Sequence, residues 1–269
     1  AAMAMRNGQE GASPAAARLQ VKLAHSEAEV RESQRLRYRV FSEEMGARVQ
    51  GAAAGIESDH YDRHCQHLMV RDAVSNRVVS STRILTRPVA RRAGGFYSES
   101  EFELGSVLRL PGSFMEIGRT CVDPEYRSGA AIGMLWAGLA QFIELNRIDY
   151  LIGCASISME DGGATARAIM LRLRERHPSP SHLRVRPRRP LPEASPGPES
   201  PSAAPAMPPL LKAYLRVGAW VCGEPCWDPD FGVADLFVLL DVDNLQERYV
   251  RHFLNRSDSV QRSSYAMAC

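Results

Sequence analysis

The sequence predicts an α/β (α+β) fold, with a mixed central sheet flanked by helices and an insertion rich in proline. Segments of β-branched and apolar residues alternate along the chain with segments whose apolar residues follow helical spacing. Residues 149–156 form a nearly continuous apolar stretch, which is typical of a strand buried on both faces. Residues 178–209 hold 11 of the 17 prolines and interrupt this pattern.

The chain length indicates one large domain with irregular additions. Its 269 residues are 45% hydrophobic, which is enough to bury a substantial core. The first 17 residues are rich in Ala, Gly and Ser and predict a disordered lead-in. We expect the folded domain over residues 18–256 and a polar tail over residues 257–269.

The first half of the chain predicts a strand, a helix and a hairpin. Residues 18–24 alternate between polar and apolar side chains, as in a strand with one buried face. Ser26 is a candidate helix N-cap, Glu29 completes a capping box and Gly46 marks the helix end. Residues 66–72 and 77–88 are rich in β-branched side chains and flank a short turn, so they predict a hairpin.

The second half predicts further strands and helices around the insertion. We expect, in order, a strand over 113–122, a helix from Ile132, a strand over 149–156, the insertion over 178–209, a helix and a last strand over 233–242. The insertion is too rich in proline for regular structure. Between Arg167 and Arg189, eight arginines face a single acid, Glu175, which predicts a basic face.

Composition excludes several classes of function. The net charge is only +2, whereas nucleic-acid-binding domains are usually strongly basic, so no nucleic-acid partner is expected. No apolar stretch reaches the ~18 residues needed to span a bilayer, which predicts a soluble or peripherally bound protein. The six cysteines are scattered, as in a reduced cytoplasmic protein, and neither His64-Cys65-Gln66-His67 nor Cys222 to Cys226 has the spacing of a metal site.

A turn rich in small residues joins the strand over 113–122 to the helix that follows. The stretch Ser128-Gly129-Ala130-Ala131 would expose backbone N–H groups at the positive end of that helix, as in sites that hold phosphate esters. Small side chains would let a ligand approach the backbone. The alternative is that the glycines only tighten the turn.

The motif around this turn resembles the donor-binding motif of the GNAT acyltransferases. V-x-P-x-Y-R ends at Arg127 and precedes the small-residue turn and an amphipathic helix. GNAT enzymes usually have R-x-x-G-x-G/A, whereas here Gly129 and Gly133 are the second and sixth residues after Arg127. This difference favours the single phosphodiester of phosphopantetheine on an acyl carrier protein over the pyrophosphate of coenzyme A.

Longer motifs resemble two related families. Four groups of residues occur in the order found in acyl-homoserine lactone synthases: Arg37-x-x-x-Phe41, Glu57-x-Asp59-x-Tyr61-Asp62, Arg83 and Glu116-x-x-Arg119. The Trp that follows the Phe in those synthases is missing here. Stretches including YDRHCQHLMVRD, EIGRTCVDPEYRSGA and PPLLKAYLRVGAWVCGEPCWDPDFGVADLFVLL resemble bacterial ornithine N-acyltransferases over residues 35–253, outside the proline-rich stretch.

The resemblance implies a GNAT-like fold and a direct attack of the α-amine of ornithine on a (3-hydroxy)acyl thioester. Glu116 is the candidate base, and a bulge at Gly118 would place it on the same side of the strand as Arg119. The alternative for Glu116 is a buried ion pair with Arg119. Tyr214 lies four residues before Gly218, as does the GNAT Tyr that protonates the leaving thiolate; the alternative is a packing aromatic.

Five residues are candidates for holding the acceptor. Asp59 and Asp62 would bind the cationic side chain of ornithine, Arg83 or Arg37 would bind its α-carboxylate, and Phe41 belongs to the same motif set. The alternative is a salt-bridge network that orders the loop after the first helix.

Several expectations concern cofactors, partners and rival functions. We expect no permanently bound cofactor; the donor is the acyl-phosphopantetheine of acyl carrier protein, for which the arginine cluster would be a docking face. Location would be cytoplasmic, with peripheral contact at an anionic inner membrane as an option. Rival functions are an N-acyl amino acid synthase using lysine, glutamine or glycine, and a non-catalytic acyl-carrier-binding or membrane-binding module.

Overall fold

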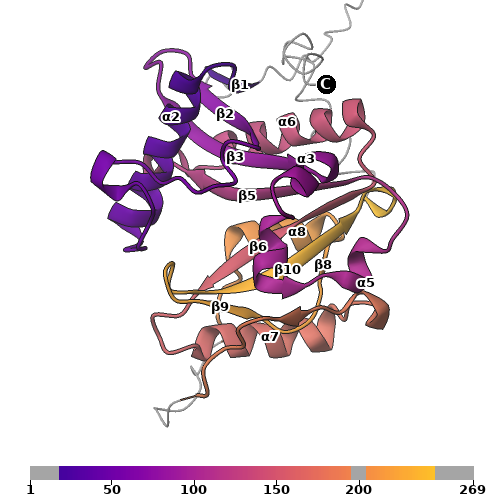
Figure 1. The fold of residues 1–269 in the computed structure, drawn as a ribbon. Helices are drawn as coiled ribbons and strands as arrows, with labels where there is room; N and C mark the ends of the chain where they lie inside the picture. Colours follow the sequence, from indigo (N-terminus) through magenta and orange to yellow (C-terminus); the bar gives the residue numbers. More distant parts are fainter. Residues whose placement is uncertain (1–17, 195–203, 246–269) are drawn as a thin grey trace, which may run out of the picture.

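A computed structural model describes residues 18–194 and 204–245, and these form a mixed sheet covered by helices on both faces (Figure 1). The expected lead-in over 1–17 and tail over 257–269 lie outside the described residues. The strands of the main sheet are β1 (Leu19–Leu23), β2 (Gln66–Asp72), β3 (Val78–Thr86), β5 (Phe114–Val122), β6 (Tyr150–Ser158), β8 (Trp220–Val221), β9 (Cys226–Asp228) and β10 (Val233–Asp241).

The strand order is β1-β2-β3-β5-β6-β10-β8, and β9 also pairs with β10. All these pairings are antiparallel except that of β5 with β6, which is parallel. The carboxyl ends of β5 and β6 therefore meet at one end of the sheet. A second, two-stranded sheet joins β4 (Phe102–Glu103) to β7 (Arg186–Pro187).

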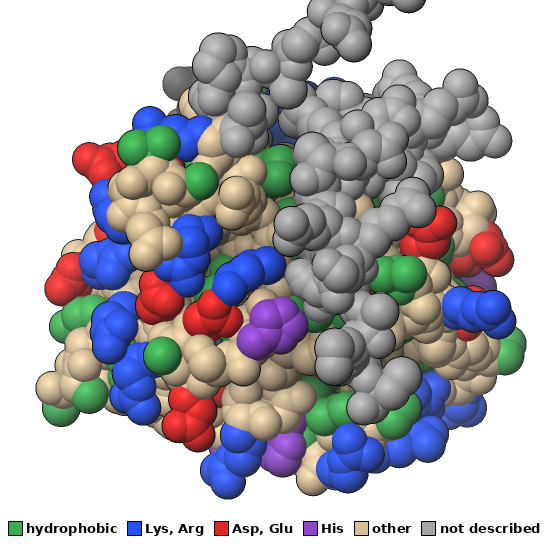
Figure 2. Space-filling model, turned by 90° about the horizontal axis from the view of Figure 1, so that it is seen from above, with side chains coloured by type: hydrophobic (Ala, Val, Ile, Leu, Met, Phe, Trp, Pro, Cys, Tyr) green, Lys and Arg blue, Asp and Glu red, His purple; other side chains and the backbone are tan. Residues whose placement is uncertain are grey.

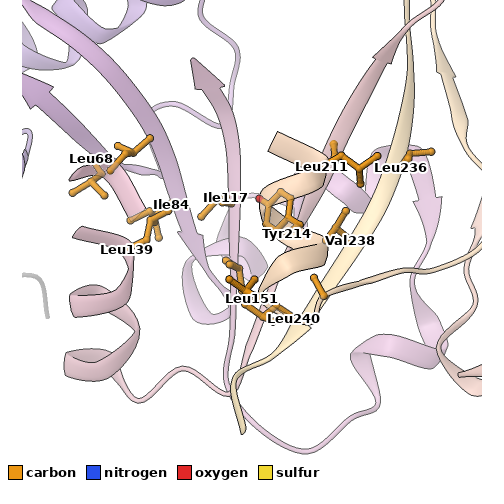
Figure 3. Packing of buried hydrophobic residues seen from close by; sticks show 14 of the residues in the cluster. Leu68, Ile84, Ile117, Leu139, Leu151, Leu211, Tyr214, Leu236, Val238 and Leu240 are labelled. Carbon is orange, nitrogen blue, oxygen red and sulfur yellow. The ribbon is translucent and has the colours of Figure 1, made fainter. Parts of the chain in front are cut away.

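Helices cover the sheet on both sides. They are α2 (Glu27–Arg37), continued by a π-helix (Tyr38–Glu44), α3 (Arg87–Arg92), α4 (Tyr97–Glu101), α5 (Gly105–Leu108), α6 (Ala130–Asn146), α7 (Ala164–Arg176) and α8 (Pro209–Arg216), with short 3-10 turns at Ala52–Ala54, Pro124–Tyr126, Ser181–Leu183 and Val242–Asn244. Apolar residues of α6, α7 and α8 share one core cluster with the sheet, while α2 and the α3–α5 segment pack in two other clusters. Figure 3 shows the first cluster, in which Tyr214 of α8 lies between Ile117 and Val238.

The predicted elements agree with the observed ones, and a set of short helices was missed. Ser26 caps α2 by accepting the backbone N–H of Glu29, and the helical segment ends before Gly46, whose φ is +76°. The predicted hairpin is β2 and β3, and α6 begins two residues before Ile132. No prediction covered α3, α4 and α5, because helices of four to six residues carry little periodic signal. The longer helix α7 was missed as well, because its arginines were interpreted only as part of a basic face.

The expectation that residues 178–209 lack regular structure was wrong for its first part. Residues Ser181–Leu183 form a 3-10 turn and Arg186–Pro187 pair with β4. Val185 and Pro190 form isolated bridges to Gly223 and Cys226. Proline is tolerated in such edge pairings, because its missing N–H group can lie on the side of the strand that has no partner. Residues 195–203 lie outside the described residues.

The described surface carries both charges. On the face seen in Figure 2, Lys and Arg side chains are interspersed with Asp and Glu, in keeping with the net charge of +2. The predicted arginine cluster is exposed at Arg174, Arg176, Arg184, Arg186, Arg188 and Arg189. Among the described residues, no helix is long and apolar enough to cross a membrane.

Candidate active site

A bulge in β5 shapes the site. Arg119 and Thr120 together face Thr82 of β3, because the register shifts between Ser81, opposite Cys121, and Arg83, opposite Gly118. Arg119 has a φ of +51°, which is unusual for a residue with a Cβ. The bulge predicted at Gly118 thus lies one residue further along, and it turns the Arg119 side chain to the face occupied by α2 and α4.

Beyond the bulge, β5 and β6 separate. Their parallel pairing covers only Phe114–Ile117 against Tyr150–Gly153. The later residues of β5 pair with β3 alone, and those of β6 with β10 alone. At the point of separation the backbones touch so closely that a Cβ on Gly153 would lie 2.6 Å from the carbonyl oxygen of Ile117. One backbone edge of residues 118–122 therefore borders a cleft.

The cleft has a volume of about 630 Å³. Apolar and polar groups from many parts of the chain line it, among them the π-helix after α2 (Val40, Phe41), β5 (Ile117 to Val122), the start of α6 (Ile132, Trp136), α8 (Tyr214, Arg216) and the β9–β10 region (Asp228, Phe231, Asp235). A cleft with apolar walls and a few convergent polar groups is typical of a small-molecule site.

The predicted phosphate-binding turn contributes only part of its residues to the cleft. Arg127, Gly129 and Gly133 line it, whereas Ser128, Ala130 and Ala131 do not, and Ala131 is buried in the core. Gly129 has a φ of +110° and lies just before α6.

Arg127 is paired with Glu44 through two N–H···O contacts of 2.6 and 2.8 Å. This pair is exposed, so a phosphate could compete for the guanidinium. Arg216, which was not predicted, also lines the cleft and is exposed.

Glu116 lies beneath the cleft wall and does not line it. Its carboxylate accepts the backbone N–H groups of Tyr97 and Ser98 at 2.9 and 2.8 Å. It therefore caps the N-terminus of α4 and makes no ion pair with Arg119, contrary to the alternative considered for it. Burial raises the pKa of Glu116, although the two N–H donors oppose this effect.

Asp62 is enclosed by cationic and amide donors. Arg37 donates two N–H groups to it, at 3.0 and 2.9 Å, and Arg83 and Gln34 each donate one. Burial alone would raise the pKa of Asp62, but Arg37 and Arg83 hold it well below its usual range. Arg37 is 1% exposed and does not reach the cleft, whereas Arg83 lines it.

Arg119 completes this ion-pair network. It donates to Glu57 at 3.1 Å and to Asp59 at 3.3 Å, and its guanidinium lies over the rings of Tyr97 and Phe231. Arg83 also donates two N–H groups to Asp59. Burial disfavours the charged form of Arg119, but the carboxylates of Glu57 and Asp59 raise the pKa of Arg119.

Asp59 and Asp62 therefore lie in a salt-bridge network, which was the alternative to their binding the side chain of ornithine. In this network, arginines already neutralise both carboxylates. It contains three arginines (Arg37, Arg83, Arg119) and three acids (Glu57, Asp59, Asp62), so its formal charge is zero.

Tyr214 projects from α8 onto the cleft and is 2% exposed. Its ring packs edge-on against Trp136. Within the described part of the chain, no group forms a hydrogen bond with its hydroxyl. Burial raises the pKa of Tyr214, so the hydroxyl stays protonated and available as a donor.

Several cleft residues were missed by the sequence reasoning. Trp136 and Phe231 provide aromatic walls, and Asp228 and Asp235 provide carboxylates. Asp235 lies inside the apolar strand VADLFVLLD, and an acid at a buried strand position is a signal that could have identified it. Of the others, Asp228 ends the three-residue strand β9, Phe231 lies in the following loop, and Trp136 lies on a helix face that equally suits core packing.

Comparisons with known proteins agree with this geometry. A model described as an acetyltransferase (GNAT) domain matches residues 36–137. An L-ornithine N(alpha)-acyltransferase of Rhizobium meliloti (strain 1021) is 35% identical over 250 residues, which cover 88% of this chain and 84% of the relative. One from Rhodobacter capsulatus is also 35% identical, over 88% of this chain and 95% of the relative.

A solved structure shows the same fold. The coenzyme A-dependent acyl-homoserine lactone synthase BjaI matches with a TM-score of 0.50 at 14% identity, covering 88% of this chain and 89% of that chain. At that identity the similarity supports the fold alone, whereas the curated relatives match at higher identity over most of their length. The chain therefore belongs to the L-ornithine N(alpha)-acyltransferase family of GNAT-type acyltransferases.

Proposed function

We propose that the protein transfers a (3-hydroxy)acyl chain from acyl carrier protein to the α-amine of L-ornithine, giving lyso-ornithine lipid. The observation that carries this proposal is the cleft at the point where β5 and β6 separate, in a chain 35% identical to a protein named L-ornithine N(alpha)-acyltransferase. The cleft has an unpaired strand edge for an extended donor, arginines for a carboxylate and a protonated Tyr for the leaving group.

The donor thioester would enter along the unpaired edge of residues 118–122. Backbone N–H groups on this edge can hydrogen-bond the thioester oxygen as negative charge develops on it. The phosphodiester would lie near Gly129, with Arg127 and Arg216 as cationic partners. The apolar wall that includes Trp136 would hold the acyl chain.

Acyl carrier protein is the proposed donor because the turn after β5 suits a single phosphodiester better than a pyrophosphate. Acyl carrier proteins are acidic, and the exposed arginines of α7 and the following segment offer a complementary face. We propose the same face for peripheral contact with an anionic membrane.

The acceptor would present its α-carboxylate to the cleft-lining guanidinium groups of Arg83 and Arg119. Its α-amine has a lower reference pKa than its side-chain amine and is the more readily deprotonated of the two, which favours α-acylation.

The amine would attack the thioester carbonyl directly, forming the C–N bond as the C–S bond breaks. The Tyr214 hydroxyl gives its proton to the displaced thiolate, and the proton that the amine loses restores the Tyr214 hydroxyl directly or through water, so the products are the amide and the free carrier thiol. Burial raises the pKa of Cys154 in the same cleft, so that thiol stays protonated and is a poor nucleophile for an acyl-enzyme. Glu116 would act by holding α4, which carries Tyr97 to the cleft, rather than by touching the amine.

The test is to incubate the purified protein with 3-hydroxyacyl carrier protein and a mixture of the common amino acids plus ornithine, and to identify the lipid product by mass. The expected product is the ornithine amide, formed from the carrier thioester and not from acyl-coenzyme A. A different amide would refute the acceptor. Binding of carrier without any amide would refute catalysis.

A further inference from the structure

Three carboxylates that the mechanism above does not use meet at one wall of the cleft. They are Glu101 at the end of α4, Asp228 of β9 and Asp235 of β10, and each offers an oxygen within 4.8 Å of the others. Asp228 and Asp235 line the cleft. We refer to these three residues as the carboxylate cluster.

No arginine or lysine from the described part of the chain pairs with the carboxylate cluster. Glu101 accepts the Tyr97 hydroxyl and the Cys154 thiol, Asp235 accepts the Ser156 hydroxyl, and Asp228 accepts only backbone N–H groups. The other buried carboxylates are satisfied differently, because Glu57 and Asp62 pair with Arg37 and Glu116 has two N–H donors.

The cluster cannot carry its full negative charge in the free protein. Glu101 and Asp235 are 8% and 4% exposed. Burial and the neighbouring Asp235 raise the pKa of Glu101 to about 9, and burial raises the pKa of Asp235 as well. Near neutral pH, Glu101 and Asp235 therefore share a proton, which reduces their negative charge as a bound cation would.

A second observation points to a polar ligand in this cleft. The Tyr214 side chain is buried, lines the same cleft, and its hydroxyl has no hydrogen-bond partner among the described residues. Cys154 also lines the cleft, and its thiol donates to Glu101. An unpartnered buried hydroxyl and uncompensated carboxylates that line one cleft are satisfied when a polar ligand binds.

We propose that the carboxylate cluster binds the side-chain ammonium of the acceptor amino acid and so selects ornithine over amino acids with a neutral side chain. This inference rests on the proposed function. An ammonium group has three N–H donors, which match three converging carboxylates. The ammonium would displace the proton shared by Glu101 and Asp235. Its positive charge would then balance the deprotonated carboxylates, so that no buried acid is left unpaired.

The cleft also offers groups of opposite charge for the two ends of the acceptor. Arg119 and Arg83 lie on the β5 side of the cleft, and Asp228 and Asp235 lie on the β9–β10 side. A molecule with a carboxylate at one end and an ammonium at the other would be held at both ends, with its α-amine between them. Electrostatic complementarity of this kind gives specificity by excluding neutral or anionic side chains.

The experiment compares ornithine with norvaline, which has the same carbon chain without the side-chain amine, in wild type and Asp235→Asn. Asp230→Asn is the matched control, because Asp230 lies on the adjacent loop but is exposed and pairs with Arg48. Acylation rates and the rise in Tm produced by each amino acid are measured. The Tm of each variant without ligand confirms that it folds.

We expect Asp235→Asn to lower kcat/KM for ornithine by roughly 30-fold or more and to abolish the ornithine-induced rise in Tm. Norvaline should be used equally poorly by both proteins, and Asp230→Asn should behave as wild type. An Asp235→Asn variant that binds ornithine as wild type does, or that loses norvaline and ornithine activity by the same factor, would overturn the inference in favour of a spectator or a general base.

Two further outcomes distinguish an ammonium site from a metal site and from an inactive protein. Loss of wild-type activity with EDTA, restored by Mg²⁺, would assign the cluster to a divalent cation and overturn the inference. A wild-type protein that acylates no amino acid would instead refute the proposed function, while ornithine binding abolished by Asp235→Asn would still support the cation site.

Discussion

Asp62 is the most connected acid of the buried ion-pair network, and replacing it with Asn tests whether that network is structural. Four N–H···O contacts of 2.9 to 3.0 Å end on its carboxylate: two from Arg37 and one each from Arg83 and Gln34. Asp62→Asn removes the charge and turns an NH₂ group toward these donors. Three arginines would then face only Glu57 and Asp59.

The expected loss of stability is about 3–5 kcal/mol, the usual cost of breaking a buried ion pair by removing one partner. The side chains of Asp62 and Arg37 are 6% and 1% exposed, so solvent cannot compensate. The matched control is Asp230→Asn, whose ion pair with Arg48 has side chains 65% and 75% exposed. That change should cost roughly 0–1 kcal/mol.

The pH dependence gives a second test. Because the pKa of Asp62 is lower in the folded protein than the reference value near 3.9, its stabilisation is complete above that value. It is lost as the pH falls below about 4 toward the folded pKa. The difference in unfolding free energy between wild type and Asp62→Asn, measured by urea denaturation at pH 7 and at pH 3, should therefore shrink at pH 3.

A difference below 1 kcal/mol at pH 7, with loss of ornithine binding, would refute this reasoning. It would show that Asp62 serves the acceptor and not the fold.

Three other changes have distinct expected results. Tyr214→Phe removes a hydroxyl without a described partner, so Tm should stay within ~2 °C while turnover of the carrier thioester falls on the order of 100-fold; unchanged turnover would exclude it as the proton donor. Glu116→Gln leaves one N–H of α4 unsatisfied, so thermal unfolding should show a loss of ~1–3 kcal/mol, and equal activity and stability would contradict its positioning role. Arg176→Glu with Arg186→Glu should raise KM for acyl carrier protein at low salt with little change in kcat, and no difference from wild type there would argue against docking on this face.

The sequence predicted the main sheet and helices well, because most of them carry a clear apolar period. Alternation along β5 even indicated where a bulge was needed, since Glu116 and Arg119 could share a face only with one extra residue between them. The proline-rich segment was misjudged because its short pairings with β4, Gly223 and β9 depend on distant partners.

The candidate site was predicted less completely. Arg37, Asp59 and Asp62 were identified as acting together, but sequence order cannot show whether opposite charges face a ligand or one another. The carboxylate cluster escaped notice because Glu101 is separated from Asp235 by about half of the chain and belongs to a helix too short to predict. Such groups become neighbours only through the pairing of the strands.

The separation of β5 from β6 also bears on how the protein avoids aggregation. An unpaired strand edge on a protein surface invites pairing with another chain, and proteins normally shorten, charge or cover it. Here the open edge of residues 118–122 lies inside a cleft walled by α6 and α8, in the middle of the sheet and not at its margin. The only route to this edge among the described elements is through the cleft, so the same arrangement that presents the edge to a ligand keeps it away from the sheet margins where another chain would pair.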